Sequence, residues 1–171
     1  WGNCQDGVGN TMNTGKIVVH GSAGDVIGYS QRGGTIYIEG DVGYRAGVHL
    51  KGVAQNWPTI VIGGSTGDFL GEYMAGGTII VLGLGTDGSP VGEWVGSGMH
   101  GGEIYIRGEV ADFQLGKEVN VQEASQEDLV RLDPFLNEYS RLFDVPKNLL
   151  TSKGFLRLTP KGHRPYSKLY A

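Results

Sequence analysis

The sequence predicts an all-β protein: a right-handed parallel β-helix with a small C-terminal helical cap and an extended arm. Three observations predict it. A strand-like pentad with Ile at its second position recurs five times, the repeats share a core period of 19 residues, and glycine punctuates each repeat. A fixed period with one strand per repeat is the signature of a solenoid, in which each repeat stacks on its neighbours. The five Ile positions are 19, 24, 19 and 25 residues apart, so two repeats hold inserts of 5 and 6 residues.

Each repeat begins with a short strand whose side chains alternate between two faces. The five predicted strands are 16–20, 35–39, 59–63, 78–82 and 103–107. The inward positions carry Ile or Val throughout, and burying each such side chain is worth roughly 1.5–3 kcal/mol. The inward pairs are Ile17/Val19, Ile36/Ile38, Ile60/Ile62, Ile79/Val81 and Ile104/Ile106. Because parallel crossovers within one sheet are right-handed in nearly all cases, the stacked strands predict a right-handed helix of about four to five coils.

The outward positions of the same strands are also apolar, although water would face them in a bare solenoid. This outer ladder consists of Val18, Tyr37, Val61, Ile80 and Tyr105. A contiguous apolar surface of this kind requires a cover. We expect the C-terminal segment of the chain to cover part of the ladder and a partner protein to cover the rest. All five residues are therefore candidate partner contacts.

Glycine shapes the corners between strands. Of its 31 residues, 28 lie between Gly2 and Gly108, and Gly-x-x-Gly turns occupy residues 21–24, 40–43 and 64–67. Glycine supplies backbone angles with φ > 0 and lets one coil stack closely on the next. This density does not indicate collagen, because the chain lacks a Gly-X-Y triplet and its Ile/Val/Tyr pentads are good β formers.

The repeat stops after Gly108, so the chain divides into a predicted β-helix over residues 1–112 and a C-terminal segment over residues 113–171. Ser125 and Asp128 have the spacing of a capping box, which predicts the start of a helix. Apolar residues then follow on one stripe at spacings of 3, 4, 3 and 4: Leu129, Leu132, Leu136, Tyr139 and Phe143. This pattern predicts an amphipathic unit that caps the open end of the solenoid.

Pro134 falls inside that stripe. Proline is disfavoured in a helix interior but suits the first turn of a new helix, for which Asp133 would be the cap. We therefore predict a short helix, a kink and a second helix that ends before Pro146.

Residues 155–171 are predicted to form an extended basic arm. Residues 1–112 carry 5 basic and 11 acidic side chains, whereas residues 113–171 carry 9 basic and 7 acidic ones. No surface of aromatic and basic side chains accompanies the arm, which disfavours nucleic acid as its partner and favours docking on protein. Arg157, Lys161 and Arg164 are the candidate contacts of this arm.

Motifs that could indicate a catalytic or ligand-binding site are better explained as structural elements of the repeats. Residues 83–88 read Gly-Leu-Gly-Thr-Asp-Gly, but Ser89, Pro90 and Gly92 follow where a dinucleotide site needs a helix. We predict a protruding loop there. The histidines do not cluster with other metal ligands, and we expect no catalytic, cofactor-binding or metal-binding residue in the repeats. They are His20, His49, His100 and His163.

Cys4 is the single cysteine, so no intramolecular disulfide forms, and a reducing, cytoplasmic location is expected. No apolar run approaches the length of a membrane span, and no signal-peptide pattern is present, so we expect no membrane association. The chain begins with Trp1 rather than Met, which leaves room for residues upstream.

Two phrases of the repeat resemble a known family. Residues 71–83 read Gly-Glu-Tyr-Met-Ala-Gly-Gly-Thr-Ile-Ile-Val-Leu-Gly, and residues 95–102 read Val-Gly-Ser-Gly-Met-His-Gly-Gly. Over roughly residues 9–112 the chain resembles the GXGXG domain of the glutamate synthase large subunit, where this β-helix is a scaffold between the other domains. The β-helix subunit of formylmethanofuran dehydrogenase and its formyltransferase/hydrolase relatives have similar coils.

The resemblance implies a non-catalytic assembly subunit of a split, glutamate synthase-like glutamine amidotransferase and oxidoreductase. Its partners would be the other subunits, which would carry the glutaminase site, the FMN and the iron–sulfur cluster, and Trp57 in the first insert is a further candidate contact. The alternative is the β-helix subunit of a formylmethanofuran dehydrogenase or of a formyltransferase/hydrolase-type C1 complex. A free-standing solenoid enzyme would need a carboxylate cluster, whereas Asp25, Asp41 and Asp68 look like turn residues. The isolated chain is a candidate for self-association through its outer ladder.

Overall fold

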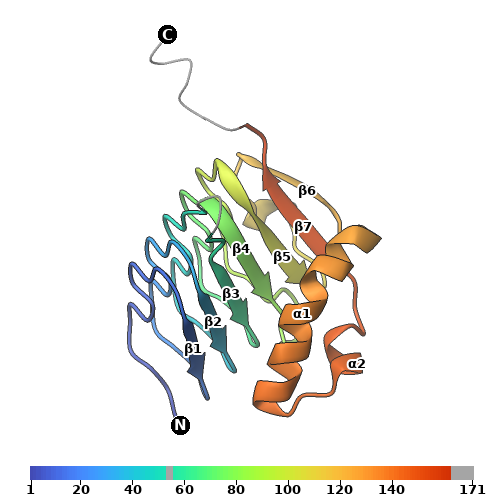
Figure 1. Ribbon diagram of the computed structural model, residues 1–171. Helices are drawn as coiled ribbons and strands as arrows, with labels where there is room; N and C mark the ends of the chain where they lie inside the picture. The colour runs from blue at the N-terminus through green and yellow to red at the C-terminus, as the bar shows by residue number, and fades with distance from the viewer. Residues whose placement is uncertain (53–55, 163–171) are drawn as a thin grey trace.

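The structure is a computed structural model that describes residues 1–52 and 56–162. A seven-stranded sheet with the order β1-β2-β3-β4-β5-β7-β6 organises them (Figure 1). The strands are β1 (Lys16–Val19), β2 (Thr35–Ile38), β3 (Thr59–Ile62), β4 (Ala75–Val81), β5 (Gly101–Arg107), β6 (Val119–Glu123) and β7 (Phe155–Pro160). Strands β1 to β5 are parallel neighbours, whereas β7 runs antiparallel to β5 and β6. The all-β prediction is confirmed, but the sheet is mixed and not wholly parallel.

The register of the parallel strands follows the predicted period. The second Ile of each pentad lies beside its counterpart in the next strand, from Ile17 to Ile104. A second row of bridges links Ala23, Val42 and Thr66 on successive repeats. The predicted inward column is confirmed, because all its members lie in one hydrophobic core and only Ile17, on the edge strand β1, is partly buried.

One long helix covers the outward face of the sheet. Helix α1 (Gln126–Phe143) lies along the right-hand side of the strands in Figure 1. Its N-terminal part meets Tyr105 on β5 through Asp128, and its C-terminal part meets Lys16 on β1 through Glu138. The apolar stripe of the helix packs on the outer ladder in a second core, whose buried members from the helix are Leu132, Leu136, Tyr139 and Phe143.

This helix corrects two predictions. It covers the face of the sheet and not the open end of the solenoid. It also buries Tyr37, Val61, Ile80 and Tyr105 to 3% exposure or less and partly covers Val18, so these residues face their own chain and not a partner. The physical reason is length: a helix of 18 residues is about 27 Å long, enough to reach across five strands about 4.8 Å apart.

The capping box at Ser125 and Asp128 is confirmed, but the predicted kink is wrong, because α1 continues through Pro134. Pro134 lies on the exposed side of the helix, and its ring removes one bond to the carbonyl of Val130, where water can replace it. Leu132 and Leu136, on either side of this position, are buried on the sheet and hold the helix continuous. The short helix α2 (Lys147–Leu150) follows Pro146.

Strands β6 and β7 close the C-terminal end of the coils. The predicted extended arm begins as β7, in which Leu158 is fully buried in the main core and Phe155 lies in the second core. A single-turn 3-10 helix, η1 (Asp112–Gln114), joins β5 to this part of the chain. The first six residues of the arm therefore belong to the sheet. Among the helices within residues 1–52 and 56–162, none has the length and apolar character needed to span a membrane.

Candidate partner-binding surface

The candidate contacts of the basic arm have different surroundings. Arg157 lies on β7 and is ion-paired within the chain, so it is not a free docking cation. Lys161 is exposed, and its Nζ donates a hydrogen bond to the carbonyl of Lys117 at 2.8 Å. Arg164 lies outside the described residues. Docking through the arm therefore stays a prediction for Lys161 and Arg164.

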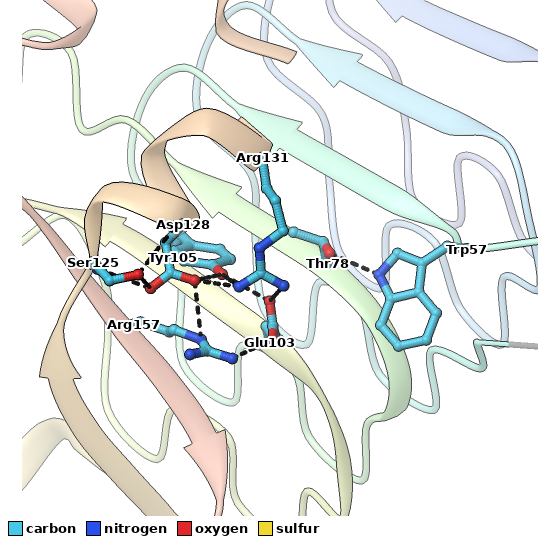
Figure 2. Close-up of polar contacts among 8 residues, drawn as sticks. All are labelled: Trp57, Thr78, Glu103, Tyr105, Ser125, Asp128, Arg131 and Arg157. Atoms are coloured by element: carbon cyan, nitrogen blue, oxygen red, sulfur yellow. Dashed lines mark hydrogen bonds and ion pairs between the residues drawn. The ribbon is translucent and has the colours of Figure 1, made fainter. Parts of the chain in front are cut away.

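Trp57, in the insert before β3, remains a candidate contact. Its side chain is 52% exposed, and its indole Nε1 donates to Thr78 Oγ1 at 2.8 Å (Figure 2). One part of the ring lies against Gly52, where an added Cβ would be 2.7 Å from Cζ3. The ring is thus held in place by its own chain and still presents surface to the outside.

Arg157 belongs to a polar network where β5, β7 and the start of α1 meet (Figure 2). The carboxylate of Asp128, only 1% exposed, accepts hydrogen bonds from the amide of Ser125 at 2.8 Å and from Arg131. The Tyr105 hydroxyl lies 2.7 Å from Glu103 Oε2 and 3.0 Å from Asp128 Oδ1, so it donates to one carboxylate at a time. Arg157 ion-pairs with both carboxylates, at 3.6 Å in the case of Asp128.

The pKa shifts in this network favour a structural role. Burial alone would raise the pKa of Asp128, but the hydrogen bonds from Ser125, Arg131 and Tyr105 outweigh it and hold that pKa well below its usual range. Burial, followed by the hydrogen bond to Glu103, raises the pKa of Tyr105 far above its usual value. Neither group titrates near neutral pH, as a general acid or base requires. The network fastens α1 and β7 to β5.

We expect this network to make the protein acid-sensitive. Because the pKa of Asp128 is lowered in the folded chain, its stabilisation is fully present above the unfolded pKa of about 3.9 and is lost as the pH falls toward the folded pKa. Thermal melts between pH 7 and pH 2 should show a loss of roughly 1–3 kcal/mol from this group, nearly all below pH 4. The Asp128→Asn variant should have a shallower acid slope. An unchanged slope in that variant would contradict the assignment.

A different feature gathers at one edge of the coils, where each repeat makes the same turn. Three alternate residues of this turn have left-handed backbone angles, and the middle one is always glycine: Gly9, Gly28, Gly47, Gly71 and Gly96. A side chain is excluded there, because a Cβ on Gly47 would lie 2.4 Å from Ile79 Cδ1 in the core. The amide of each middle glycine after the first bonds to the preceding coil, as from Gly28 to the carbonyl of Val8 at 2.8 Å.

The outer two positions of the turn are mostly not glycine, although their φ angles are positive. Eight of the nine non-glycine residues with positive φ in the described chain lie in these turns, which concentrates backbone strain on this edge. They are Thr11, Val26, Ser30, Arg45, His49, Phe69, Tyr73 and Trp94. A left-handed conformation costs roughly 1–2 kcal/mol for a residue with a Cβ, so this edge holds large side chains where glycine would be more stable. Such strain directs attention to a function at this edge.

The side chains at these positions form stacked rows. The Arg45 guanidinium lies 4.7 Å from the ring centroid of Phe69, and the Phe69 and Trp94 rings stack at 6.5 Å with an interplanar angle of 12°. In the neighbouring row, His49 and Tyr73 stack at 5.4 Å and 14°. We call the group the turn-edge aromatics: Tyr29, Tyr44, His49, Phe69, Tyr73 and Trp94.

The turn-edge aromatics are accessible. Tyr29, Tyr44, Tyr73 and Trp94 are between 39% and 53% exposed. Aromatic side chains combine large contact area with few rotatable bonds, and they are enriched at the centres of protein interfaces. The sequence-based predictions missed this surface because they rested on the glycines and the strands alone. For His49, Phe69, Tyr73 and Trp94 the available signal was their place two residues before or after a middle glycine.

Comparison with known proteins gives two findings. A family model described as the GXGXG motif matches residues 1–156. An uncharacterized protein of Methanocaldococcus jannaschii is 45% identical over 137 residues, which are 76% of this chain and 52% of that protein. The chain therefore spans about half the length of the curated relative that it matches.

Proposed function

The chain belongs to the GXGXG motif family, and on that premise we propose that it is a non-catalytic assembly subunit of a glutamate synthase-like complex. Its stacked repeats would form a right-handed parallel β-helix that positions a glutaminase module and an FMN and iron–sulfur synthase module. Residues 71–83, with the phrase Glu-Tyr-Met-Ala-Gly-Gly-Thr, support the glutamate synthase side of the family resemblance.

The observation that carries the proposal is the row of turn-edge aromatics. Each side chain is fixed on a turn that is hydrogen-bonded to neighbouring coils, such as Val26 N to Tyr44 O at 2.8 Å and Gly28 N to Val8 O at 2.8 Å. A rigid surface loses little entropy when it binds, which favours stable docking. Residues 1–112 carry 11 acidic and 5 basic side chains, so we expect a basic partner surface around its apolar contacts.

The decisive experiment is reconstitution with partner subunits. We expect the tagged chain to recover a glutaminase-type protein and a flavin/iron–sulfur protein from its native host, and to raise glutamine-dependent glutamate formation when all three are mixed. Recovery of formyl-transfer subunits in their place would replace the proposal with the C1-complex alternative. Recovery of neither set would overturn both.

A glycine substitution separates binding from folding at this surface. Trp94→Gly should change the free energy of unfolding by no more than about 1 kcal/mol, because relief of the positive φ of 63° offsets the lost stacking on Phe69, yet it should weaken partner affinity about 30-fold. Thermal melts and titration calorimetry against the recovered partner measure the two effects. The control is Val130→Ala on α1, an exposed apolar residue away from the turns, which should leave affinity unchanged. Equal affinity of Trp94→Gly and the parent chain would exclude this edge as the interface.

A further inference from the structure

A cavity of about 1350 Å³ opens between the C-terminal end of β5, the first half of α1 and the loop that joins α2 to β7. Its polar lining includes Arg107, Glu109, Glu123, Asp133, Ser152 and Lys153. Leu129, Val130 and Phe155 contribute apolar surface. The cavity is large enough for a small metabolite and combines apolar walls with a few polar groups, as ligand sites do.

Arg107 is the unusual group in this lining. It is only 6% exposed, and its guanidinium donates to the carbonyls of Leu82 at 2.8 Å and Leu149 at 2.9 Å and to the hydroxyl of Ser152 at 2.9 Å. All three acceptors are neutral. Within residues 1–52 and 56–162, no carboxylate lies within 4.0 Å of Arg107, and its buried Nε has no hydrogen-bond acceptor.

A second guanidinium in the same chain, which is partly buried, has the carboxylate partners that Arg107 lacks. Arg157 is more exposed than Arg107 and yet pairs with two carboxylates, Glu103 and Asp128. Arginine cannot lose its proton in a protein, and a buried charge without a counter-charge is strongly destabilising. Burial lowers the pKa of Arg107, as expected where no negative group offsets the loss of solvation.

The bonds of Arg107 also have a structural purpose, since they hold the end of α2 against the end of β4. These bonds use three of the five N–H groups of the guanidinium, one on Nη1 and two on Nη2, and none of their acceptors balances its charge. The positive charge, with no carboxylate within 4.0 Å among the described residues, therefore favours a ligand with an anionic group. A carboxylate suits this group, because one of its oxygens can accept the Nη1 hydrogen that the three bonds leave free while its charge offsets that of the guanidinium.

We propose that this cavity binds a small molecule with one carboxylate group, which Arg107 holds and Lys153 attracts from the rim. Glu109, Glu123 and Asp133 also line the cavity, so a doubly charged anion such as phosphate would be repelled. The same carboxylates would favour a ligand that carries an ammonium group beside its carboxylate, as an α-amino acid does. This site is independent of the proposed assembly function.

The test uses three matched probes on the intact chain: propionate, L-alanine and inorganic phosphate. L-alanine is propionate with an added amino group, so the pair isolates the contribution of the ammonium. We expect propionate and L-alanine to shift the Nε–Hε resonance of Arg107 saturably, in the concentration range up to about 100 mM that suits such small ligands. We expect L-alanine to bind more tightly than propionate.

The Arg107→Lys variant keeps the positive charge at this position. The Nε–Hε resonance that disappears from its spectrum is thereby assigned to Arg107. We expect this variant to bind both organic probes at least about 10-fold more weakly, because one ammonium group cannot keep the three bonds of Arg107 and also donate to a ligand. Arg141→Lys changes an exposed arginine on α1 that pairs with Glu138, and it should bind as the parent chain does. If Arg107→Lys fails to fold, the titration of the parent chain still decides. Binding of phosphate alone, or of no probe, overturns the proposal.

Discussion

Ile60→Asp should remove at least about 4 kcal/mol of the free energy of unfolding and leave the chain largely unfolded at 37 °C, since whole domains have only about 5–15 kcal/mol. Ile60 is fully buried on the inward face of β3, between Ile36 and Ile79 in register. Its Cδ1 also fills the space beneath the turn at Gly28, where an added Cβ would lie 2.5 Å away. An aspartate there would be a carboxylate surrounded by aliphatic side chains.

The matched control is Ile60→Val, which removes one methylene and should cost only about 0.5–1.5 kcal/mol. Urea denaturation followed by circular dichroism measures both variants. If Ile60→Asp kept the parent midpoint, the inward face of the sheet would have been assigned wrongly.

The second large effect is expected at Gly63, where α1 is fastened to the sheet. The hydroxyl of Tyr139 donates to the carbonyl of Glu39 at 2.9 Å, directly beside Gly63. A Cβ on Gly63 would lie 1.8 Å from that hydroxyl and 2.1 Å from the carbonyl oxygen. The carbonyl belongs to the backbone and cannot turn aside, so the added methyl group must displace the Tyr139 side chain from its site. Gly63→Ala should therefore cost about 3 kcal/mol.

Two further variants make this result specific. Gly154→Ala places the same methyl group where no atom lies within 4 Å, and it should be neutral or slightly stabilising. Tyr139→Phe removes the hydroxyl that collides, so the double variant with Gly63→Ala should recover part of the loss, as a double-mutant cycle would show. Additive effects in that cycle would mean that Gly63 does not act through Tyr139.

Local patterns predicted the core of the fold well. The recurrent Ile positions determine the register of β1 to β5, because shifting a strand by one residue would move every inward side chain to the outward face. The spacing of Leu132, Leu136 and Tyr139 similarly predicted a helix with one apolar face. Both predictions depend on residues close together in the chain.

What depends on distant contacts could not be predicted in this way. The apolar outer ladder indicated a cover, but periodicity does not say whether that cover is α1 or a partner. Residues 155–162 were interpreted as part of a basic docking arm, although they contain strand β7. Arg157 on this strand pairs with Glu103, a residue 54 positions earlier. Pro134 predicts a break because its local penalty is visible in the sequence, while the packing of its neighbours is not.

The two candidate sites differ in the same way, because one depends on local sequence positions and the other on contacts between distant residues. Four of the turn-edge aromatics, His49, Phe69, Tyr73 and Trp94, lie two residues from a middle glycine and were therefore open to prediction from the sequence. The surroundings of Arg107 were not, because its three acceptors come from the end of β4, α2 and the following loop. A buried charge without a counter-charge is recognised only when all its spatial neighbours are known.

Helix α1 also changes how cooperatively the stacked repeats unfold. In an array whose repeats touch only their neighbours, terminal repeats can fray while the middle stays ordered. Here the helix touches the first strand through Glu138 and Lys16 and the fifth through Asp128 and Tyr105. The first coil cannot open without loosening the helix that holds the last, so the linear array acquires the all-or-none cooperativity of a globular domain.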